Sequence, residues 1–397
     1  MVGTPAERYI RLGLQLDRHV SGIVDSYAGP AELAAAVQAA APVEPATIAA
    51  DADALLAELD DGWLRDQVAG LRVYASVLAG EERAYADEVE ACFGVRPTHT
   101  DEARFAEAHD RLEELLPGSG SLADRYRRWE SSYRVPPADV ERLMRAVVEE
   151  ARTWTRELVD LPVGEEVVVE AVRDEPWLAF CEYLGALRSR ISVNVDLPIS
   201  AIELLTLSIH ETYAGHHTER CLKEQLLVQE RGLLEETIVL VPTPQSLVSE
   251  GIAELATELL LGGDARPALA GVLHDAGVEL DLDHALAVER ALAPCRWVDV
   301  NASLLLHEQG ASEAETVGYI ERWALQAPER AAHAIRFFRE PTSRTYVVTY
   351  AAGRQLCRTY VAGSPDRFRR LLTEQVRVGD LVAGRGEPRP YAQPIGS

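Results

Sequence analysis

Residues 209–219 read IHETYAGHHTE, and this stretch decides which fold the chain is expected to adopt. A His-Glu pair on a helix, followed about one turn later by another histidine, is typical of zinc peptidases. In those enzymes two histidines hold the metal and the glutamate activates a water molecule. The usual spacing is HExxH, but the fifth position here is Ala214. The segment therefore predicts a zinc site in which His210 and Glu211 keep their usual roles and the second histidine comes from 216–217.

The spacing of the histidines requires an interruption of the helix. On a regular helix His210 and His217 share a face but lie about 10.5 Å apart along the axis, too far to share a metal with bonds of about 2.0–2.1 Å. His216 lies on the wrong face of such a helix. A bulge or break at Ala214-Gly215 is therefore a necessary prediction of the zinc hypothesis, and Gly215 supplies the backbone freedom for it. We favour His216 as the ligand and keep His217 as the alternative ligand, or as a residue that supports the ligands.

A glutamate in the next predicted helix completes a set of three ligands. Residues 243–244, Thr followed by Pro, predict a helix start, and Glu250 falls in the first turns of that helix, beside a glycine that permits close packing. Zinc hydrolases of the His₂Glu type take their third ligand from a following helix and leave one position for water. We therefore expect His210, His216 and Glu250 to bind Zn²⁺. Glu254, one turn further on, is placed to accept the other ring N–H of a ligand histidine or to serve as an alternative ligand.

Most of the rest of the chain is predicted to be helical, because Ala, Leu, Glu and Arg dominate and apolar residues recur three and four positions apart. A capping box of Ser200 and Glu203 starts the helix that carries the histidines. The expected helices cover 9–20, 64–78, 103–116, 138–158, 201–227 with its interruption, 243–262, 266–275, 283–308, 312–325 and 345–376. Between 161 and 198 three short segments, 167–172, 178–184 and 188–195, predict a small antiparallel sheet before the metal-binding helix.

The chain divides into three predicted parts. Residues 1–160 form an N-terminal helical lobe, and residues 161–378 form a catalytic lobe with the small sheet and the zinc-binding helices. Residues 379–397 are rich in Gly, Pro and Arg and are expected to be a loosely ordered tail. A length of 397 residues fits a single two-lobed enzyme.

Composition excludes some classes of partner. Asp and Glu number 64 against 39 Lys and Arg, a net charge of -25, and such a charge repels nucleic acid and anionic membranes. Five widely spaced cysteines without a CxxC pair predict reduced thiols. The first residues do not follow a signal-peptide pattern, and no stretch approaches the roughly 20 apolar residues that span a bilayer. We therefore expect a cytoplasmic protein without nucleic-acid or membrane partners; the sequence does not indicate its oligomeric state.

The chain resembles a large bacterial family, long labelled a domain of unknown function, whose motifs are HExxPGHH and EGWALYxE. Residues 210–217 and 250–251 carry the most specific part of the likeness. Weaker parts lie in Gly22 to Pro30, in 188–198, in Arg296, Asp299 and His307, and in 350–354. Structures of that family resemble the Taq-type carboxypeptidases. The likeness therefore implies a mainly α, gluzincin-like fold, similar to helical zinc peptidases with a deep cleft.

Two departures from the family's motifs bear on the site. Ala214 replaces the family's proline, so the helix break must rest on Gly215. Ile252 and Glu254 replace the aromatic part of EGWALY, so the pocket beside Glu250 is expected to differ in shape and charge. These departures affect the identity of the substrate more than the binding of metal.

The predicted chemistry is hydrolysis of an amide bond by metal-activated water. Glu211 is expected to take the proton of the water and pass it to the leaving amine. The tetrahedral oxyanion needs a donor besides the metal. The resemblance implies Tyr350 for this role, with Tyr346 as the second candidate.

Substrate contacts are predicted from the needs of an exopeptidase. Arg190, Arg344 or Arg354 is expected to pair with a substrate carboxylate. The strand segment 189–194, which includes Asn194, is expected to offer backbone groups to an extended peptide. His307 is expected either to support the site or to lie in the core. We thus predict a metallopeptidase-like zinc hydrolase that acts on a peptide or a small amide, either as a carboxypeptidase-like enzyme or as a small-peptide hydrolase. The alternatives are a zinc amidohydrolase on a non-peptide amide and a non-catalytic binding protein with the same fold.

Overall fold

The computed structural model describes residues 3–175 and 178–383 and is mainly helical, with two small sheets. The helices of the first half are α1 (Pro5–Asp17), α2 (Ala31–Ala39), α3 (Pro45–Glu58), α4 (Trp63–Leu78), α5 (Tyr85–Phe93), α6 (Ala103–Leu115), α7 (Leu122–Ser132), α8 (Pro137–Leu158) and α9 (Ala201–Glu211). Those of the second half are α10 (His216–Lys223), α11 (Pro244–Gly262), α12 (Arg266–Asp275), α13 (Leu282–Leu292), α14 (Val298–His307), α15 (Glu313–Trp323), α16 (Pro328–Arg339), α17 (Val347–Val361), α18 (Pro365–Thr373) and α19 (Val378–Ala383). Short π- and 3-10-helical segments η1 (Glu224–Gln229), η2 (Leu234–Thr237) and η3 (Ala293–Trp297) connect some of them.

The larger sheet is mixed, not antiparallel as predicted. Its strands are β2 (Glu166–Val172), β3 (Ala179–Gly185) and β4 (Arg188–Asn194), in the order β2-β4-β3. β3 and β4 form an antiparallel hairpin, whereas β2 pairs with β4 in parallel. The prediction failed because alternation of side chains marks a strand but does not tell which strand becomes its neighbour.

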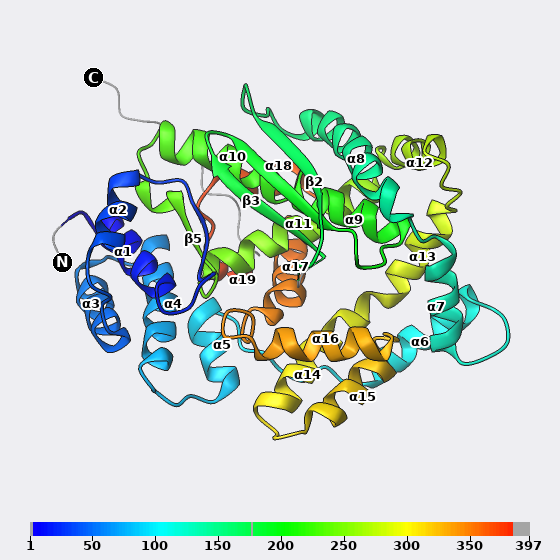
Figure 1. Cartoon of the computed structure of the whole chain (residues 1–397), viewed down its shortest axis with the longest axis horizontal. Coiled ribbons are helices and arrows are strands. Elements are labelled where there is room, and N and C mark those ends of the chain that lie inside the picture. The colour runs from blue at the N-terminus through cyan, green and yellow to red at the C-terminus, as the bar shows by residue number, and fades with distance from the viewer. Residues whose placement is uncertain (1–2, 176–177, 384–397) are drawn as a thin grey trace.

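A second, two-stranded sheet was not predicted. β1 (Val24–Tyr27) pairs antiparallel with β5 (Ile238–Leu240), with Val24 opposite Leu240. Strands of four and three residues are too short to show a periodic pattern. This pairing brings the N-terminal part of the chain beside β5, and β1 also contacts β3 (Figure 1).

Several helix ends differ from the prediction for local reasons. The helix expected over 283–308 is divided into α13, η3 and α14, with Pro294 in η3. The helix expected over 345–376 is divided at Ala362 and Gly363, which have φ angles of 46° and 79° and end α17. α16 was not predicted. Residues 379–383 of the predicted tail belong to α19, and residues 384–397 lie outside the described residues.

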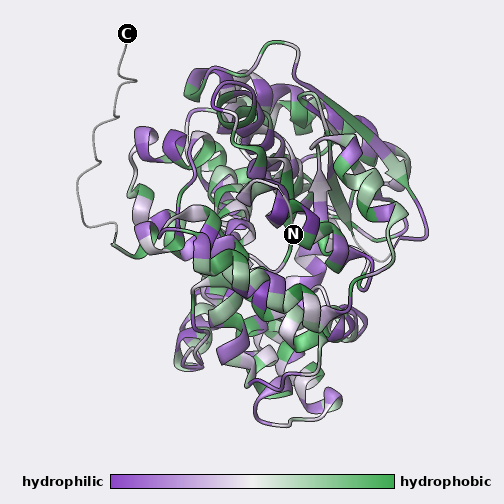
Figure 2. Ribbon diagram, turned by 90° about the vertical axis from the view of Figure 1, so that its left-hand side faces the viewer, coloured by the Kyte–Doolittle hydropathy of each residue, from purple (hydrophilic) through white to green (hydrophobic). Residues whose placement is uncertain are grey.

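The apolar side chains form one extended core and two smaller ones. The extended core takes residues from α4 to α19, including Leu143 and Ile202 on either side of residue 160. One smaller core joins α1, α3 and α4 to β5, and the other joins α6 to α13. Most helices therefore carry one apolar and one polar face, as the alternating colours along the ribbons indicate (Figure 2). The division of the chain at residue 160 stays a prediction.

None of the helices within the described residues is long and apolar enough to cross a membrane. All five cysteines are free thiols, as expected from their spacing.

Candidate metal centre

The predicted interruption of the metal-binding helix is present. α9 ends at Glu211 and α10 begins at His216. Between them Ala214 adopts a left-handed backbone with φ of 65°, a conformation that an L-residue with a side chain adopts at a cost. Gly215 lies so close to the backbone of His210 that a Cβ atom on it would lie 2.0 Å from the His210 carbonyl oxygen. Only glycine fits at this approach.

Side-chain hydrogen bonds hold this interruption in one conformation. The backbone N–H of Ala214 donates to Oγ1 of Thr218 at 3.0 Å. The N–H of Thr218 donates to the carbonyl of Thr212 at 3.2 Å, and Oγ1 of Thr212 donates to the carbonyl of Ser208 at 2.6 Å. The end of α9 and the start of α10 are therefore tied to each other, which fixes where His210 and His216 point.

His210, His216 and Glu250 form a group whose candidate ligand atoms all lie within 4.8 Å of one another. Nε2 of His210 is 3.4 Å from Oε2 of Glu250, and Nε2 of His216 is 3.5 Å from Oε1. The two imidazole rings meet edge to face, with centroids 4.8 Å apart. Tetrahedral zinc with bonds of about 2.0–2.1 Å holds its ligand atoms about 3.3 Å apart. These separations therefore suit a metal of that size.

One oxygen of the Glu250 carboxylate accepts no hydrogen bond within the described residues and is faced by Nε2 of His210. Oε1 accepts a hydrogen bond of 2.5 Å from the hydroxyl of Tyr346. Oε2 is buried and has no hydrogen-bond partner among residues 3–175 and 178–383. A buried carboxylate oxygen without a donor is costly unless a cation faces it, so this orphaned oxygen fits a metal ligand.

The charges of the group favour a positive ion at its centre. Burial alone raises the pKa of Glu250, but the two histidines outweigh it and hold that pKa well below its usual range. Burial lowers the pKa of His210, and the carboxylate of Glu250 reverses this effect and raises it to about 9. The pKa of His216 is raised in the same way. Without a metal, protons therefore supply the positive charge that this donor set attracts.

The outer ring nitrogens of both histidines face polar side chains. Nδ1 of His216 lies 3.2 Å from the hydroxyl of Ser249, which donates to Glu219 at 2.5 Å. Nδ1 of His210 lies 4.0 Å from Glu254, the residue expected to face a ligand histidine. Such partners orient imidazole ligands and fix which nitrogen is free for a metal.

Glu211 and Tyr350 lie in the electrostatic field of the centre. Burial raises the pKa of the Glu211 carboxyl, and the neighbouring histidines partly oppose that rise. The ring of Tyr350 meets the ring of Tyr346 edge to face at 5.6 Å. The hydroxyl of Tyr346 donates to Glu250, whereas the described residues include no hydrogen-bond partner for the hydroxyl of Tyr350.

His217 points away from the candidate ligands. Its Nδ1 lies 2.8 Å from the hydroxyl of Ser189, and its Nε2 lies 3.1 Å from Oε2 of Glu165. Both ring nitrogens are therefore used in a buried network that also includes the hydroxyl of Tyr213. Of the two histidines left open by the sequence, His216 is the one that meets His210 and Glu250. Sequence spacing could not decide this, because the choice depends on the direction of α10 after the break.

The strand at 189–194 cannot add an extended peptide as predicted. β4 is the central strand of its sheet, and its backbone is paired with β2 on one side and β3 on the other. The amide of Asn194 bonds the backbone of Glu175 and Asp196. Arg190 lies between Glu170 and Glu182. A contact from Asn194 or Arg190 to the ligands is absent from the described structure, and their role in substrate binding stays a prediction.

The other predicted residues have varied surroundings. Arg344 pairs with Glu88 and lies over the ring of Tyr85. His307 stacks on the same ring and lies 3.0 Å from the carbonyl of Phe338; it is half-buried and lines a small pocket with Arg339. Arg354 lies between Glu254 and Glu258, beside the centre.

Asp25 is a site residue that sequence reasoning missed. It lies on β1. Burial raises its pKa, the positive charges of Arg220 and His216 oppose that rise, and the carboxylate of Glu250 adds to it. Its carboxylate is 3.9 Å from Arg220. The signal available was its place in the weak Gly22 to Pro30 likeness, but only the pairing of β1 with β5 brings it to the centre.

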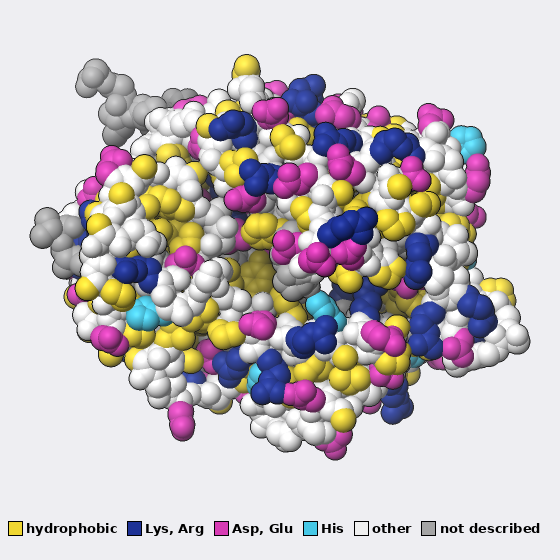
Figure 3. Space-filling view, viewed as in Figure 1, with side chains coloured by type: hydrophobic (Ala, Val, Ile, Leu, Met, Phe, Trp, Pro, Cys, Tyr) yellow, Lys and Arg dark blue, Asp and Glu magenta, His cyan; other side chains and the backbone are white. Residues whose placement is uncertain are grey.

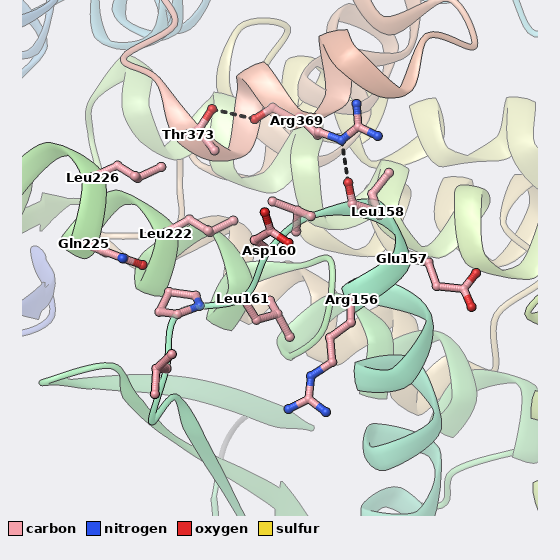
Figure 4. Close-up of a pocket in the computed structure, with 13 residues that line it drawn as sticks. Arg156, Glu157, Leu158, Asp160, Leu161, Leu222, Gln225, Leu226, Arg369 and Thr373 are labelled. Atoms are coloured by element: carbon pink, nitrogen blue, oxygen red, sulfur yellow. Dashed lines mark hydrogen bonds between the residues drawn. The ribbon is translucent and has the colours of Figure 1, made fainter.

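Two cavities lie apart from the three candidate ligands. One of about 530 Å³ lies where the end of α8 meets α10, η1 and α18; Arg156, Asp160, Leu222 and Arg369 are among the residues that line it (Figure 4). A second, of about 540 Å³, is lined by residues of α6, α13, η3 and α17. The face in Figure 3 is also hollowed near its middle, with apolar side chains in the recess and charged ones around it.

No protein-family model matches the chain, and no curated protein matches it in sequence. Its fold is similar to that of a candidate lipoprotein from Colwellia psychrerythraea, with a TM-score of 0.52 and 16% identity, covering 87% of this chain and 55% of that one. It is also similar to a candidate lipoprotein of unknown function from Shewanella oneidensis, with a TM-score of 0.50 and 13% identity, covering 93% of this chain and 68% of that one.

This chain therefore spans about half the length of the Colwellia protein. At these identities the likeness shows a shared fold alone. The gluzincin-like fold and the family resemblance inferred from the motifs stay predictions.

Proposed function

We propose that this chain is a zinc-dependent hydrolase that cleaves amide bonds, with peptides as the favoured substrates. The observation that carries the proposal is the approach of His210 and His216 to the two oxygens of Glu250, one of which has no other partner among the described residues. Two imidazoles and one carboxylate are the protein ligands of the thermolysin type of hydrolytic zinc site. Zn²⁺ bound there would supply the acidification of water and the polarisation of a carbonyl that amide hydrolysis needs.

Glu211 is the proposed base. It follows a ligand histidine directly, and burial raises its pKa, which makes the carboxylate a stronger base. It takes a proton from the attacking water and delivers it to the nitrogen of the leaving amine.

Two tyrosines of the same region have different roles in this proposal. Tyr346 positions Glu250 through its 2.5 Å hydrogen bond. Tyr350 keeps its hydroxyl available and donates to the substrate oxygen on which negative charge develops. A carboxypeptidase-like or small-peptide specificity follows from the resemblance and stays the favoured form of the proposal.

Elemental analysis of purified protein tests the metal assignment. The full chain should carry about one zinc per molecule, and His210→Ala and Glu250→Ala should each lose it, because each removes a ligand. His333→Ala is the matched control, since this partly exposed histidine of α16 bonds Arg336 and is not one of the candidate ligands. Full zinc occupancy in either ligand variant would show that the ligands are wrongly assigned.

Turnover tests the chemistry separately. Glu211→Gln should retain zinc and lose nearly all activity, because an amide cannot accept the proton. Dipeptide libraries and small non-peptide amides, assayed side by side, distinguish a peptidase from an amidohydrolase. A zinc-bearing wild-type protein inactive on both would favour the non-catalytic alternative, and a fully active Glu211→Gln would remove Glu211 as the base.

A further inference from the structure

Five arginines line one pocket of about 540 Å³. They are Arg104 of α6, Arg290 of α13, Arg296 of η3, and Arg354 and Arg358 of α17. The chain as a whole carries a net charge of -25, so this gathering of one sign opposes the charge of the rest of the molecule. A concave site lined by one sign of charge concentrates ions of the opposite sign.

Two carboxylates of α11 reach three of these arginines. Glu254 pairs with Arg296 at 2.7 Å. Glu258 pairs with Arg354 at 2.9 Å and with Arg358 at 3.1 Å. The protein therefore supplies two negative charges to three guanidinium groups.

The other two arginines have no such partner. Within the part of the chain that the structure describes, no carboxylate lies within ion-pair distance of Arg104 or Arg290. Glu289 of α13 is the further acidic group near Arg296, and burial raises the pKa of its carboxyl, while Arg296 lowers it.

The arginines also act unfavourably on one another. The pKa of Arg354 is lowered by burial and, next, by the positive charge of Arg296, in spite of Glu258 and Glu254. Arg354 is partly buried, whereas the other four arginines are exposed, so that water partly screens their mutual repulsion. Negative charge from outside the protein would relieve this repulsion.

We propose that this pocket binds a small oxyanion that carries two or more negatively charged groups, either carboxylates or phosphates. Guanidinium groups bind both through paired N–H donors in a planar fork. The five groups come from four elements, so an ion with a single charged group would meet only part of them. None of His210, His216 and Glu250 lines the pocket. The pocket adjoins the candidate metal centre through Glu254, which pairs with Arg296 and faces His210, but anion binding is measured without turnover and so is tested separately from the hydrolase function.

Isothermal titration calorimetry of the purified full chain tests this site. The probes are propane-1,2,3-tricarboxylate and fructose 1,6-bisphosphate, with acetate and inorganic phosphate as carriers of a single charged group. At least one of the two larger probes should bind saturably and more than tenfold tighter than its single-group counterpart. The probe that binds tighter identifies the carboxylate or the phosphate class as the ligand.

Paired variants assign the binding to the pocket. Arg104→Ala with Arg290→Ala removes two arginines that hold no ion pair, so folding should survive, as circular dichroism will show. This double variant should bind at least tenfold more weakly. Arg188→Ala with Arg231→Ala is the matched control, because both are exposed and outside the pocket. Absence of saturable binding, or equal loss in the control pair, would overturn the proposal.

Discussion

Gly251 of α11 packs directly on Gly353 of α17. A Cβ atom on Gly251 would lie 2.4 Å from the carbonyl oxygen of Gly353, and one on Gly353 would lie 2.3 Å from that of Leu247. The two helices therefore cross at backbone contact near the middle of the molecule (Figure 1). This crossing places Glu250 beside Tyr346, and it explains why a glycine follows the candidate ligand.

Gly251→Ala should destabilise the protein and weaken zinc binding. The added methyl group has no space and must separate α11 from α17, at a cost of roughly 1–3 kcal/mol or more. Urea unfolding and zinc content measure the two effects. Gly271→Ala is the control, because this glycine lies in α12 with nothing within 4 Å of a Cβ. It should stabilise the protein by about 0.5–1 kcal/mol; similar losses in both variants would contradict the packing argument.

Substitution of the two adjacent histidines, His216 and His217, should distinguish a metal ligand from a residue that only stabilises the fold. His216→Ala should lose zinc. His217→Ala should keep zinc and lower the free energy of unfolding by roughly 1–3 kcal/mol, because it removes the buried partner of the Ser189 hydroxyl and one of the partners of the Glu165 carboxylate. Zinc analysis and urea unfolding of both variants provide the comparison. Loss of zinc in His217→Ala, with retention in His216→Ala, would reverse the assignment.

The sequence predicted this centre because its evidence is local. His210, Glu211, Gly215 and His216 lie within seven positions, and the bond lengths of zinc required a break between them. The partners of His217 were not predictable, since Glu165 and Ser189 are distant along the chain and meet it only in the folded core. The same holds for Asp25, whose strand is too short to leave a pattern.

Local capping signals were only partly reliable. Ser200 caps α9 by accepting from the N–H of Glu203, as predicted, but the side chain of Glu203 pairs with Arg330 of α16. Thr243 precedes α11 as expected, yet its hydroxyl donates to the carbonyl of Leu240 and does not cap the helix. In both cases a tertiary neighbour or a preceding strand competes for the side chain, and sequence alone does not reveal that competitor.

Ala214→Gly should stabilise the protein by about 0.5–1 kcal/mol, because glycine adopts a φ of 65° without strain. Ala214→Pro, the residue of the motif that this segment resembles, should cost roughly 3 kcal/mol. Proline fixes φ near −65° and removes the N–H that Thr218 accepts. Urea unfolding measures both changes. Ala302 is a buried helical alanine in α14, and Ala302→Gly should destabilise the protein by about 1 kcal/mol. If both substitutions by glycine change the stability in the same direction, Ala214 is not strained.

Asp299 should make stability depend on pH. Its Oδ1 is buried, with no hydrogen-bond partner in the described part of the chain, and burial raises the pKa of its carboxyl to about 6. The folded state therefore holds the proton more tightly than the unfolded state, whose pKa is near 3.8. The stability from this proton is fully present below the unfolded pKa and is lost as pH rises through about 6.

Asp299→Asn tests this directly, because the amide carries no charge at any of these pH values. Between pH 4.5 and 7.5 the wild type should lose roughly 1–3 kcal/mol more of its free energy of unfolding than the variant does. Urea unfolding at both pH values gives this double difference, in which other titrating groups cancel. Asp283→Asn alters a largely exposed side chain, 75% accessible, and should leave the wild-type difference unchanged. An Asp299→Asn protein with the full wild-type pH dependence would mean that Asp299 is already ionised in the fold at neutral pH.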